Sequence, residues 1–146
     1  MSRLGTAYLR GLQAIGRRLD YVTNAFDREW DVLVVLDACR ADLLRSVAPD
    51  FEFLGEVESV RSVGSSSSEW LENTFLGHPE TGRTAMVTGN TWTDRYLDAD
   101  GFAALDEVWK YAWDDEAGTV PAAAVTDRAI ALARERDPDR LVAHYM

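Results

Sequence analysis

The sequence predicts an α/β domain built on a mostly parallel sheet with helices on both faces. Residues 31–37 hold five consecutive apolar residues, mostly β-branched, which is typical of a central parallel strand buried on both faces. Two further short apolar runs, 84–88 and 141–145, predict strands of the same sheet. Segments with helical spacing separate these runs, and such alternation indicates right-handed crossovers and parallel pairing.

The first third of the chain divides into four segments. Residues 3–19 are amphipathic, which predicts a helix packed on the domain, with a membrane-surface helix as the alternative. Residues 21–30 read as a linker to the first strand. After that strand, residues 38–47 have helical spacing, and Pro49 ends the helix because proline cannot continue it. Residues 51–60 alternate loosely between apolar and acidic side chains, which predicts a half-exposed strand near an edge.

The remainder of the chain predicts three helices and one irregular segment. Residues 69–76 and 92–97 have the spacing of short helices. Residues 102–113 are rich in aromatic side chains and are expected to be irregular. Residues 121–136 predict a longer helix, because the segment is alanine-rich, begins with proline and carries arginines at its negative C-terminal end.

Composition limits the classes of function. The net charge of −10 argues against a nucleic-acid ligand, whose phosphates attract basic residues. Lys110 is the only lysine beside fourteen arginines, and this acid-rich, lysine-poor balance indicates a high-salt (halophilic) cytoplasm. Cys39 is the only cysteine, so an internal disulfide is excluded, and we expect a buried, unreactive thiol. Neither a signal-peptide core nor a transmembrane segment is found, so we expect a cytoplasmic protein.

Asp37 is the first candidate site residue. It ends the 31–37 strand directly before a helix, and open α/β sheets bind ligands at the carboxyl ends of their strands. Its carboxylate oxygens are suitable ligands for a divalent cation. Two roles stay open at this point, because an aspartate here either binds metal or substrate or caps the following helix.

The serine cluster 65–68 is the second candidate. Helix N-termini bind anions, and a metal-bound serine hydroxyl becomes a nucleophile without a histidine base. His78 and His144 are the only histidines and no G-x-S-x-G motif occurs, so a Ser-His-Asp triad has little support. The alternative is that the serines cap the helix, with Glu69 and Ser66 forming a capping box. No Walker, G-x-G-x-x-G or C-x-x-C motif supports nucleotide or zinc-cluster binding.

Five segments carry a family resemblance. They are Val34–Asp42, Arg61–Trp70, Met86–Gly89, Asp106–Trp109 and Leu141–Met146, and the resemblance that they carry extends over nearly all of residues 24–146. Together they resemble the alkaline phosphatase-like superfamily, in particular its archaeal sulfatase-like proteins. The resemblance implies an alkaline phosphatase-like fold in which Asp37 binds a divalent metal and Ser66 or Ser67 is the nucleophile. The oxygens of Asp37 and of that serine should then lie within ~5 Å of each other, because each metal–oxygen bond spans ~2.0–2.6 Å.

The chain departs from the family pattern in two places. True sulfatases carry a Cys- or Ser-x-Pro-x-Arg signature around a formylglycine, whereas residues 65–70 contain neither proline nor arginine. A plain serine, as in the phosphatase, phosphodiesterase and phosphoglycerol-transferase members, is therefore expected. The family's other metal ligands, an Asp-His pair and later histidines, do not occur. We therefore expect residues 31–146, which follow an N-terminal helix and linker (1–30), to be the N-terminal part of a C-terminally incomplete domain with negligible turnover by itself.

Two functions of different classes follow. The first is a metal-dependent hydrolase or transferase of phosphate or sulfate esters on a small molecule or glycan, with Zn, Mn, Mg or Ca as cofactor. Arg40 and Arg61 are the candidates for contacting the ester anion, on the basis of their charge. The second is a degenerate, non-catalytic family member that binds a partner or an anionic glycan through the aromatic segment 109–113.

Overall fold

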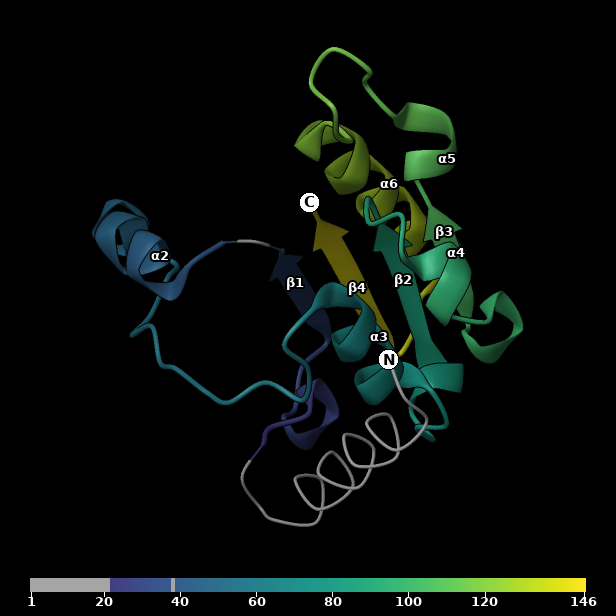
Figure 1. The fold of residues 1–146 in the computed structure, drawn as a ribbon, viewed down its shortest axis with the longest axis horizontal. Coiled ribbons are helices and arrows are strands. Elements are labelled where there is room, and N and C mark those ends of the chain that lie inside the picture. Colours follow the sequence, from purple (N-terminus) through teal and green to yellow (C-terminus); the bar gives the residue numbers. More distant parts are fainter. Residues whose placement is uncertain (1–21, 38) are drawn as a thin grey trace, which may run out of the picture.

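The computed structural model describes residues 22–37 and 39–146, and it has an α/β fold around one four-stranded sheet (Figure 1). The strands are β1 (Val32–Leu36), β2 (Thr84–Thr88), β3 (Ala104–Glu107) and β4 (Arg140–Tyr145). Their order is β1-β4-β2-β3, and every neighbouring pair is parallel. The α/β class, the parallel pairing and the shared sheet of the three apolar runs are therefore confirmed. The helix predicted over 3–19 lies outside the described residues.

Helices cover both faces of the sheet, as predicted. Side chains alternate along β2 and β4, so neighbouring residues enter different cores. On one face, α6 (Ala122–Arg136) packs against both strands, and the buried core there includes Ala85, Val87, Val125, Ala129, Leu132, Leu141 and Ala143. On the other face, Leu71 and Phe75 of α3 (Ser67–Phe75) pack against Met86 of β2 and Val142 of β4.

The remaining helices are short. They are α2 (Ala41–Val47), α4 (Thr93–Tyr96) and α5 (Trp109–Ala112), with the 3-10 turns η1 (Ala25–Asp27), η2 (Ala48–Asp50), η3 (Thr81–Arg83) and η4 (Ala99–Gly101). Figure 1 shows α2 well away from the sheet, and none of residues 41–47 is buried. The predictions for 38–47, 69–76, 92–97 and 121–136 are thus confirmed as helices with shifted ends.

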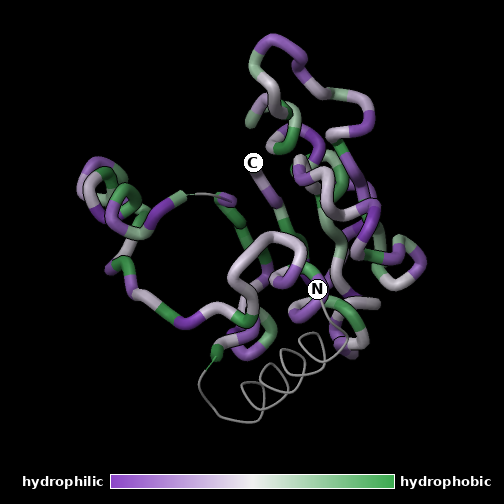
Figure 2. The backbone as a smooth tube through the Cα atoms, viewed as in Figure 1, coloured by the Kyte–Doolittle hydropathy of each residue, from purple (hydrophilic) through white to green (hydrophobic). Residues whose placement is uncertain are grey.

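β1 is an edge strand with one exposed face, so the prediction of a central strand buried on both faces is wrong. Among the described residues it pairs with β4 alone. Val32, Val34 and Leu36 are 56%, 55% and 46% exposed, whereas Leu33 and Val35 pack with the α3-side core. The physical reason is that α6 covers β4 and β2 and leaves β1 uncovered. Figure 2 shows β1 coloured as hydrophobic all the same. An apolar run in the sequence therefore does not show whether a helix or a second strand covers it.

Three smaller predictions are also corrected. Residues 51–60, all of them described, form no strand, because the segment runs outside the sheet and meets no partner strand until the single bridge between Thr23 and Ser62. The segment 102–113 is not irregular: it contains β3 and α5, and β3 was missed because half of its residues are acidic. Cys39 is exposed and not buried, because the chain leaves the sheet after Asp37 on its way to α2.

A covered and an uncovered part of the sheet can be compared through two valines, Val142 of β4 and Val34 of β1. Val142→Ala should lower the free energy of unfolding by about 2 kcal/mol, because it removes two methyl groups from a fully buried side chain beside α3. Val34→Ala, at 55% exposure, should change it by less than about 0.5 kcal/mol. Urea unfolding of both variants measures the difference. Equal losses would show that something covers the α6-side face of β1.

Candidate functional site

Polar residues gather where the strands of the sheet end. Asp37 directly follows β1, His144 is the last residue but one of β4, Thr88 ends β2, and Glu107 ends β3. Asn90 lies two residues beyond Thr88. Because parallel strands end at the same edge, four separate parts of the chain contribute to one polar rim. This is the edge at which open α/β sheets bind ligands.

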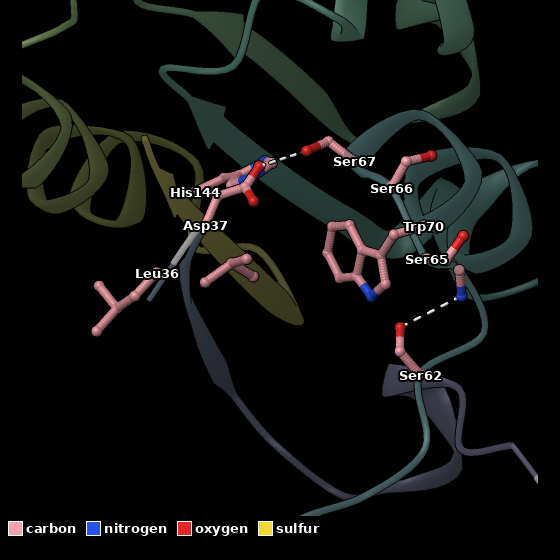
Figure 3. A pocket seen from close by; sticks show the side chains of 10 residues that line it. Leu36, Asp37, Ser62, Ser65, Ser66, Ser67, Trp70 and His144 are labelled. Carbon is pink, nitrogen blue, oxygen red and sulfur yellow. Dashed lines mark hydrogen bonds and ion pairs between the residues drawn. The ribbon is translucent and has the colours of Figure 1, made fainter. Parts of the chain in front are cut away.

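Ser67 and Asp37 contact each other directly at this rim (Figure 3). The Ser67 Oγ donates a hydrogen bond of 2.7 Å to Asp37 Oδ2, across 30 positions of sequence. Ser67 is the first residue of α3, and the Asp37 N–H donates to the Tyr145 carbonyl at 3.0 Å, which ties it to the end of β4. The prediction that Asp37 and a serine of the 66–67 pair lie within ~5 Å at one edge is therefore confirmed for Ser67.

Ser66 has a different environment. It is the N-cap of α3, and its Oγ accepts a hydrogen bond of 3.3 Å from the Glu69 N–H. The capping interpretation thus holds for Ser66. The expected capping box with Glu69 does not form, because the Glu69 carboxylate accepts from the N–H and Oγ of Ser65 and not from the N–H of Ser66. Ser66 precedes the helix with an extended backbone and its hydroxyl faces Glu69, whereas the hydroxyl of Ser67 is directed at Asp37.

The serine loop is fixed onto the start of α3 from two sides. Glu69 Oε2 accepts from Ser65 Oγ at 2.7 Å and from Ser65 N–H at 2.9 Å. The side-chain hydrogen bond from Ser65, followed by the backbone one, lowers the pKa of Glu69 below its usual value, so the carboxylate is charged and accepts both bonds at neutral pH. Gly64 permits the close approach, because a Cβ there would lie 2.3 Å from the backbone nitrogen of Trp70.

Two further residues contact Asp37, and sequence reasoning assigned neither of them to the site. Asn90 Nδ2 donates to Asp37 Oδ2 at 2.8 Å, and His144 Nε2 lies 3.4 Å from the same oxygen. Both side chains are almost fully buried, at 1% exposure. Each lies at or near the end of an apolar strand, as Asp37 does, but only the pairing of the strands shows that they meet Asp37.

Thr88 orients this pair. The Asn90 N–H donates to Thr88 Oγ1 at 3.0 Å, and the same oxygen lies 3.4 Å from His144 Nδ1. Because Nε2 faces a carboxylate it carries the imidazole proton, and Nδ1 then accepts from the Thr88 hydroxyl. The indole of Trp70 packs at a steep angle on the imidazole, with ring centroids 5.7 Å apart. His144 is therefore held in place as a donor toward Asp37.

The two arginines predicted to contact an anion do not line the pocket beside Asp37 and Ser67. Arg40 forms an exposed ion pair with Asp42, with 2.7 Å between Nη2 and Oδ2, at the start of α2. The Arg61 carbonyl accepts from the Thr23 N–H at 2.8 Å. Within the described part of the chain, the side chains that line the pocket beside Asp37 and Ser67 include neither arginine, although Ser62 next to Arg61 does line it.

That pocket has a volume of about 390 Å³, and two of its lining side chains are of the kind that bind cations. The Asp37 carboxylate and the Ser67 hydroxyl are the hard oxygen ligands that Mg²⁺, Mn²⁺ and Ca²⁺ prefer. Residues 22–37 and 39–146 contain no group of three His, Cys, Asp or Glu side chains placed to hold a metal ion. This part of the chain thus supplies one carboxylate and one hydroxyl, since the two nitrogens of the His144 imidazole face Asp37 and Thr88.

Comparison with protein-family models, curated proteins and solved structures gave no match. The superfamily resemblance therefore remains an expectation based on the motifs. Of the helices in residues 22–37 and 39–146, none is both long and apolar enough to cross a membrane.

The capping role of Ser66 can be measured as stability. Ser66→Ala should lower the free energy of unfolding by about 1 kcal/mol, because the first turn of α3 loses its side-chain acceptor. Ser66→Asn is the matched control, since asparagine is an equally good N-cap, and it should unfold like the parent chain in urea. An equal loss in both variants would contradict the capping role.

The Ser65–Glu69 contact predicts a pH effect. Ser65→Ala removes the hydroxyl donor and keeps the N–H, so the pKa of Glu69 should rise toward its usual value. Because the folded-state pKa is depressed, the stability from this contact is complete above the pKa of an unfolded glutamate and is lost as the pH falls through the folded value. NMR titration of the Glu69 carboxyl carbon measures the shift, with Ser68→Ala as control. A titration curve unchanged by Ser65→Ala would contradict the contact.

Proposed function

We propose that this site cleaves or transfers a phosphate or sulfate ester, with Ser67 as nucleophile and Asp37 as a ligand of a divalent cation. We also propose that the chain belongs to the sulfatase-like part of the alkaline phosphatase-like superfamily. The observation that carries the proposal is the 2.7 Å hydrogen bond from Ser67 Oγ to Asp37 Oδ2 at the carboxyl edge of a parallel sheet. It joins the two residues to which the motifs assign nucleophile and metal ligand.

The position of Ser67 at the start of α3 suits attack on an anionic ester. Ser67 begins α3, so its hydroxyl lies at the positive end of the helix dipole, where the negative charge of a phosphate or sulfate is stabilised. In the proposed reaction the Ser67 oxygen bonds to phosphorus or sulfur as the bond to the alcohol oxygen breaks. Water, or a second alcohol in a transferase, then attacks the covalent intermediate and releases Ser67.

Asp37 orients the attacking hydroxyl. Its Oδ2 accepts the hydrogen bond from Ser67 Oγ at 2.7 Å, and in the proposed reaction the Ser67 proton leaves with the released alcohol. Asn90 and His144 approach the same oxygen, which fixes the orientation of the carboxylate. When bound, a divalent cation would make the serine hydroxyl more acidic and offset charge on the ester, with Asp37 as one of its ligands.

The alternative, a non-catalytic module that binds through residues 109–113, has less support. The Trp109 Nε1 donates to Thr93 Oγ1 at 3.3 Å and its ring packs against the core. Tyr111 and Trp113 are 63% and 40% exposed, so the three aromatic rings do not share one binding face. Serine chemistry at the sheet edge therefore remains the proposal.

Trapping the covalent intermediate tests the proposal. The purified chain is incubated in high salt with 4-nitrophenyl phosphate or 4-nitrophenyl sulfate, with Mn²⁺, Zn²⁺, Mg²⁺, Ca²⁺ or a chelator. Mass spectrometry with fragmentation should locate a phosphoryl or sulfuryl group on Ser67, dependent on a cation. Trapping suits a site with few ligands of its own, because it requires a single turnover.

Three variants decide the assignment. Ser67→Ala should abolish the adduct, and Asp37→Asn should slow its formation at least about a hundredfold, because the carboxylate is lost. Ser66→Ala should retain it, since Ser66 caps α3. Circular dichroism checks that each variant folds. An adduct that persists in Ser67→Ala, or no adduct with either ester and any of the four cations, would contradict the proposal.

A further inference from the structure

A cavity lies along β1, on the face of the strand that packs with α3. Its volume is about 620 Å³, and we call it the β1 cavity. Its floor is apolar and is formed by the exposed Val60 and by four half-buried side chains of the α3-side core, Trp30, Leu33, Val35 and Trp70. Its edge is polar and is formed by Thr23, Asn24, Arg28, Glu29, Glu58 and Ser62. An apolar centre within a polar edge suits an amphipathic partner.

The β1 cavity lies where the cover of the sheet is incomplete. On this face, Leu71 and Phe75 of α3 pack against β2 and β4, whereas Leu33 and Val35 of β1 face the cavity. Parallel strands are usually covered by helices on both faces. A helix with an apolar stripe would complete the layer over β1 and bury these side chains.

The sequence of residues 3–19 has the pattern of such a helix. Apolar side chains recur every three or four residues and would form one stripe on a helix, namely Leu4, Tyr8, Leu12, Ile15 and Leu19. Glycines at positions 5, 11 and 16 lower the stability of this helix by itself. The segment therefore needs a surface against which its apolar stripe can pack.

The covalent connection brings the end of the stripe close to the β1 cavity. Thr23 lies at the edge of the cavity and forms a bridge with Ser62, which also lines it. Leu19 precedes Thr23 by four residues, so their Cα atoms are at most roughly 14 Å apart. A segment tethered over so short a distance has an effective concentration on the order of millimolar. Any other partner of the cavity would have to compete with it.

Charge favours the same contact. Residues 1–21 carry four arginines and one aspartate, in a chain whose net charge is −10. At the edge of the β1 cavity, the exposed carboxylates of Glu29 and Glu58 outnumber the single arginine. Arg18 follows Ile15 by three residues, so on a helix it lies at the margin of the apolar stripe, toward the edge of the cavity.

We infer that residues 3–19 form a helix that packs into the β1 cavity through Ile15 and Leu19. Arg18 then faces the two carboxylates at the edge. The cavity takes the C-terminal part of the stripe, because the whole stripe is roughly 22 Å long on a helix and the tether holds its last turn. The partner of this surface is thus the N-terminal segment of the same chain. The inference does not depend on the proposed ester chemistry.

Limited proteolysis of the full chain tests the contact from the side of the cavity. Trypsin cuts after Arg17 and Arg18, and a packed helix is cut only in the fraction of molecules in which it has opened. Val60→Asp places a charge on the floor of the cavity and should speed this cleavage at least about tenfold. Val34→Asp places the same charge on the opposite face of β1, at a similar exposure of 55% against 58% for Val60, and should leave the rate unchanged.

A second pair of variants tests the contact from the side of the segment. Ile15→Ser removes an apolar side chain from the stripe and should speed the same cleavage about tenfold. Gln13→Ser, two residues away and on the opposite side of a helix, should leave the rate unchanged. Methyl NMR of the parent chain then locates the contact: the Ile15 methyl groups should show NOEs to those of Val35 and Val60, and none to those of Val34.

Vesicles of phosphatidylglycerol test a membrane surface as the other partner of an arginine-bearing amphipathic helix. In the same buffer, the parent chain should remain in the supernatant when the vesicles are sedimented, and the rate of cleavage should be the same with and without them. Sedimentation of the chain with the vesicles that Ile15→Ser abolishes would overturn the inference. Equal acceleration of cleavage by Val60→Asp and Val34→Asp, or NOEs from Ile15 to a surface other than the β1 cavity, would also overturn it.

Discussion

The site depends on the register between β1 and β4. Val35 pairs with His144 and Leu36 with Tyr145, and the Asp37 N–H extends this ladder by donating to the Tyr145 carbonyl at 3.0 Å. β4 also pairs with β2, so that Thr88 lies beside His144 and brings Asn90 to the same place. A slip of one residue would move every side chain of a strand to the opposite face. The strand pairing that builds the sheet therefore also assembles the polar rim.

Three donors around one carboxylate oxygen explain how the rim tolerates a charge. The Asp37 side chain is only 28% exposed, and a carboxylate that loses water needs hydrogen bonds to replace it. Ser67 and Asn90 supply them at 2.7 and 2.8 Å, with the His144 imidazole at 3.4 Å. These donors come from α3, the β2 end and β4, so the charge also ties three parts of the fold together.

The sequence predicted those residues of the site that a pattern among their neighbours in the chain identifies. Asp37 ends an apolar run and Ser67 lies in a serine cluster before a helix, so both carry their signal within a few neighbouring residues. Asn90 and His144 become site residues only through the register of β2, β4 and β1, which no local pattern encodes. The edge position of β1 escaped prediction for the same reason. Arg40 does not line the pocket beside Asp37, and its guanidinium forms an ion pair with Asp42, two residues away.

The two faces of β1 differ in what covers them. On the α6 side, Val32 and Val34 are exposed and contact no covering helix of the described chain. On the α3 side, Leu33 and Val35 pack with the core around Leu71 and Phe75. The polar side chains of the rim lie at strand and helix ends, whereas the packing that holds the sheet together lies on the strand bodies. Substitutions on the exposed face of β1 should therefore leave the contact between Ser67 and Asp37 in place, because neither Val32 nor Val34 takes part in it.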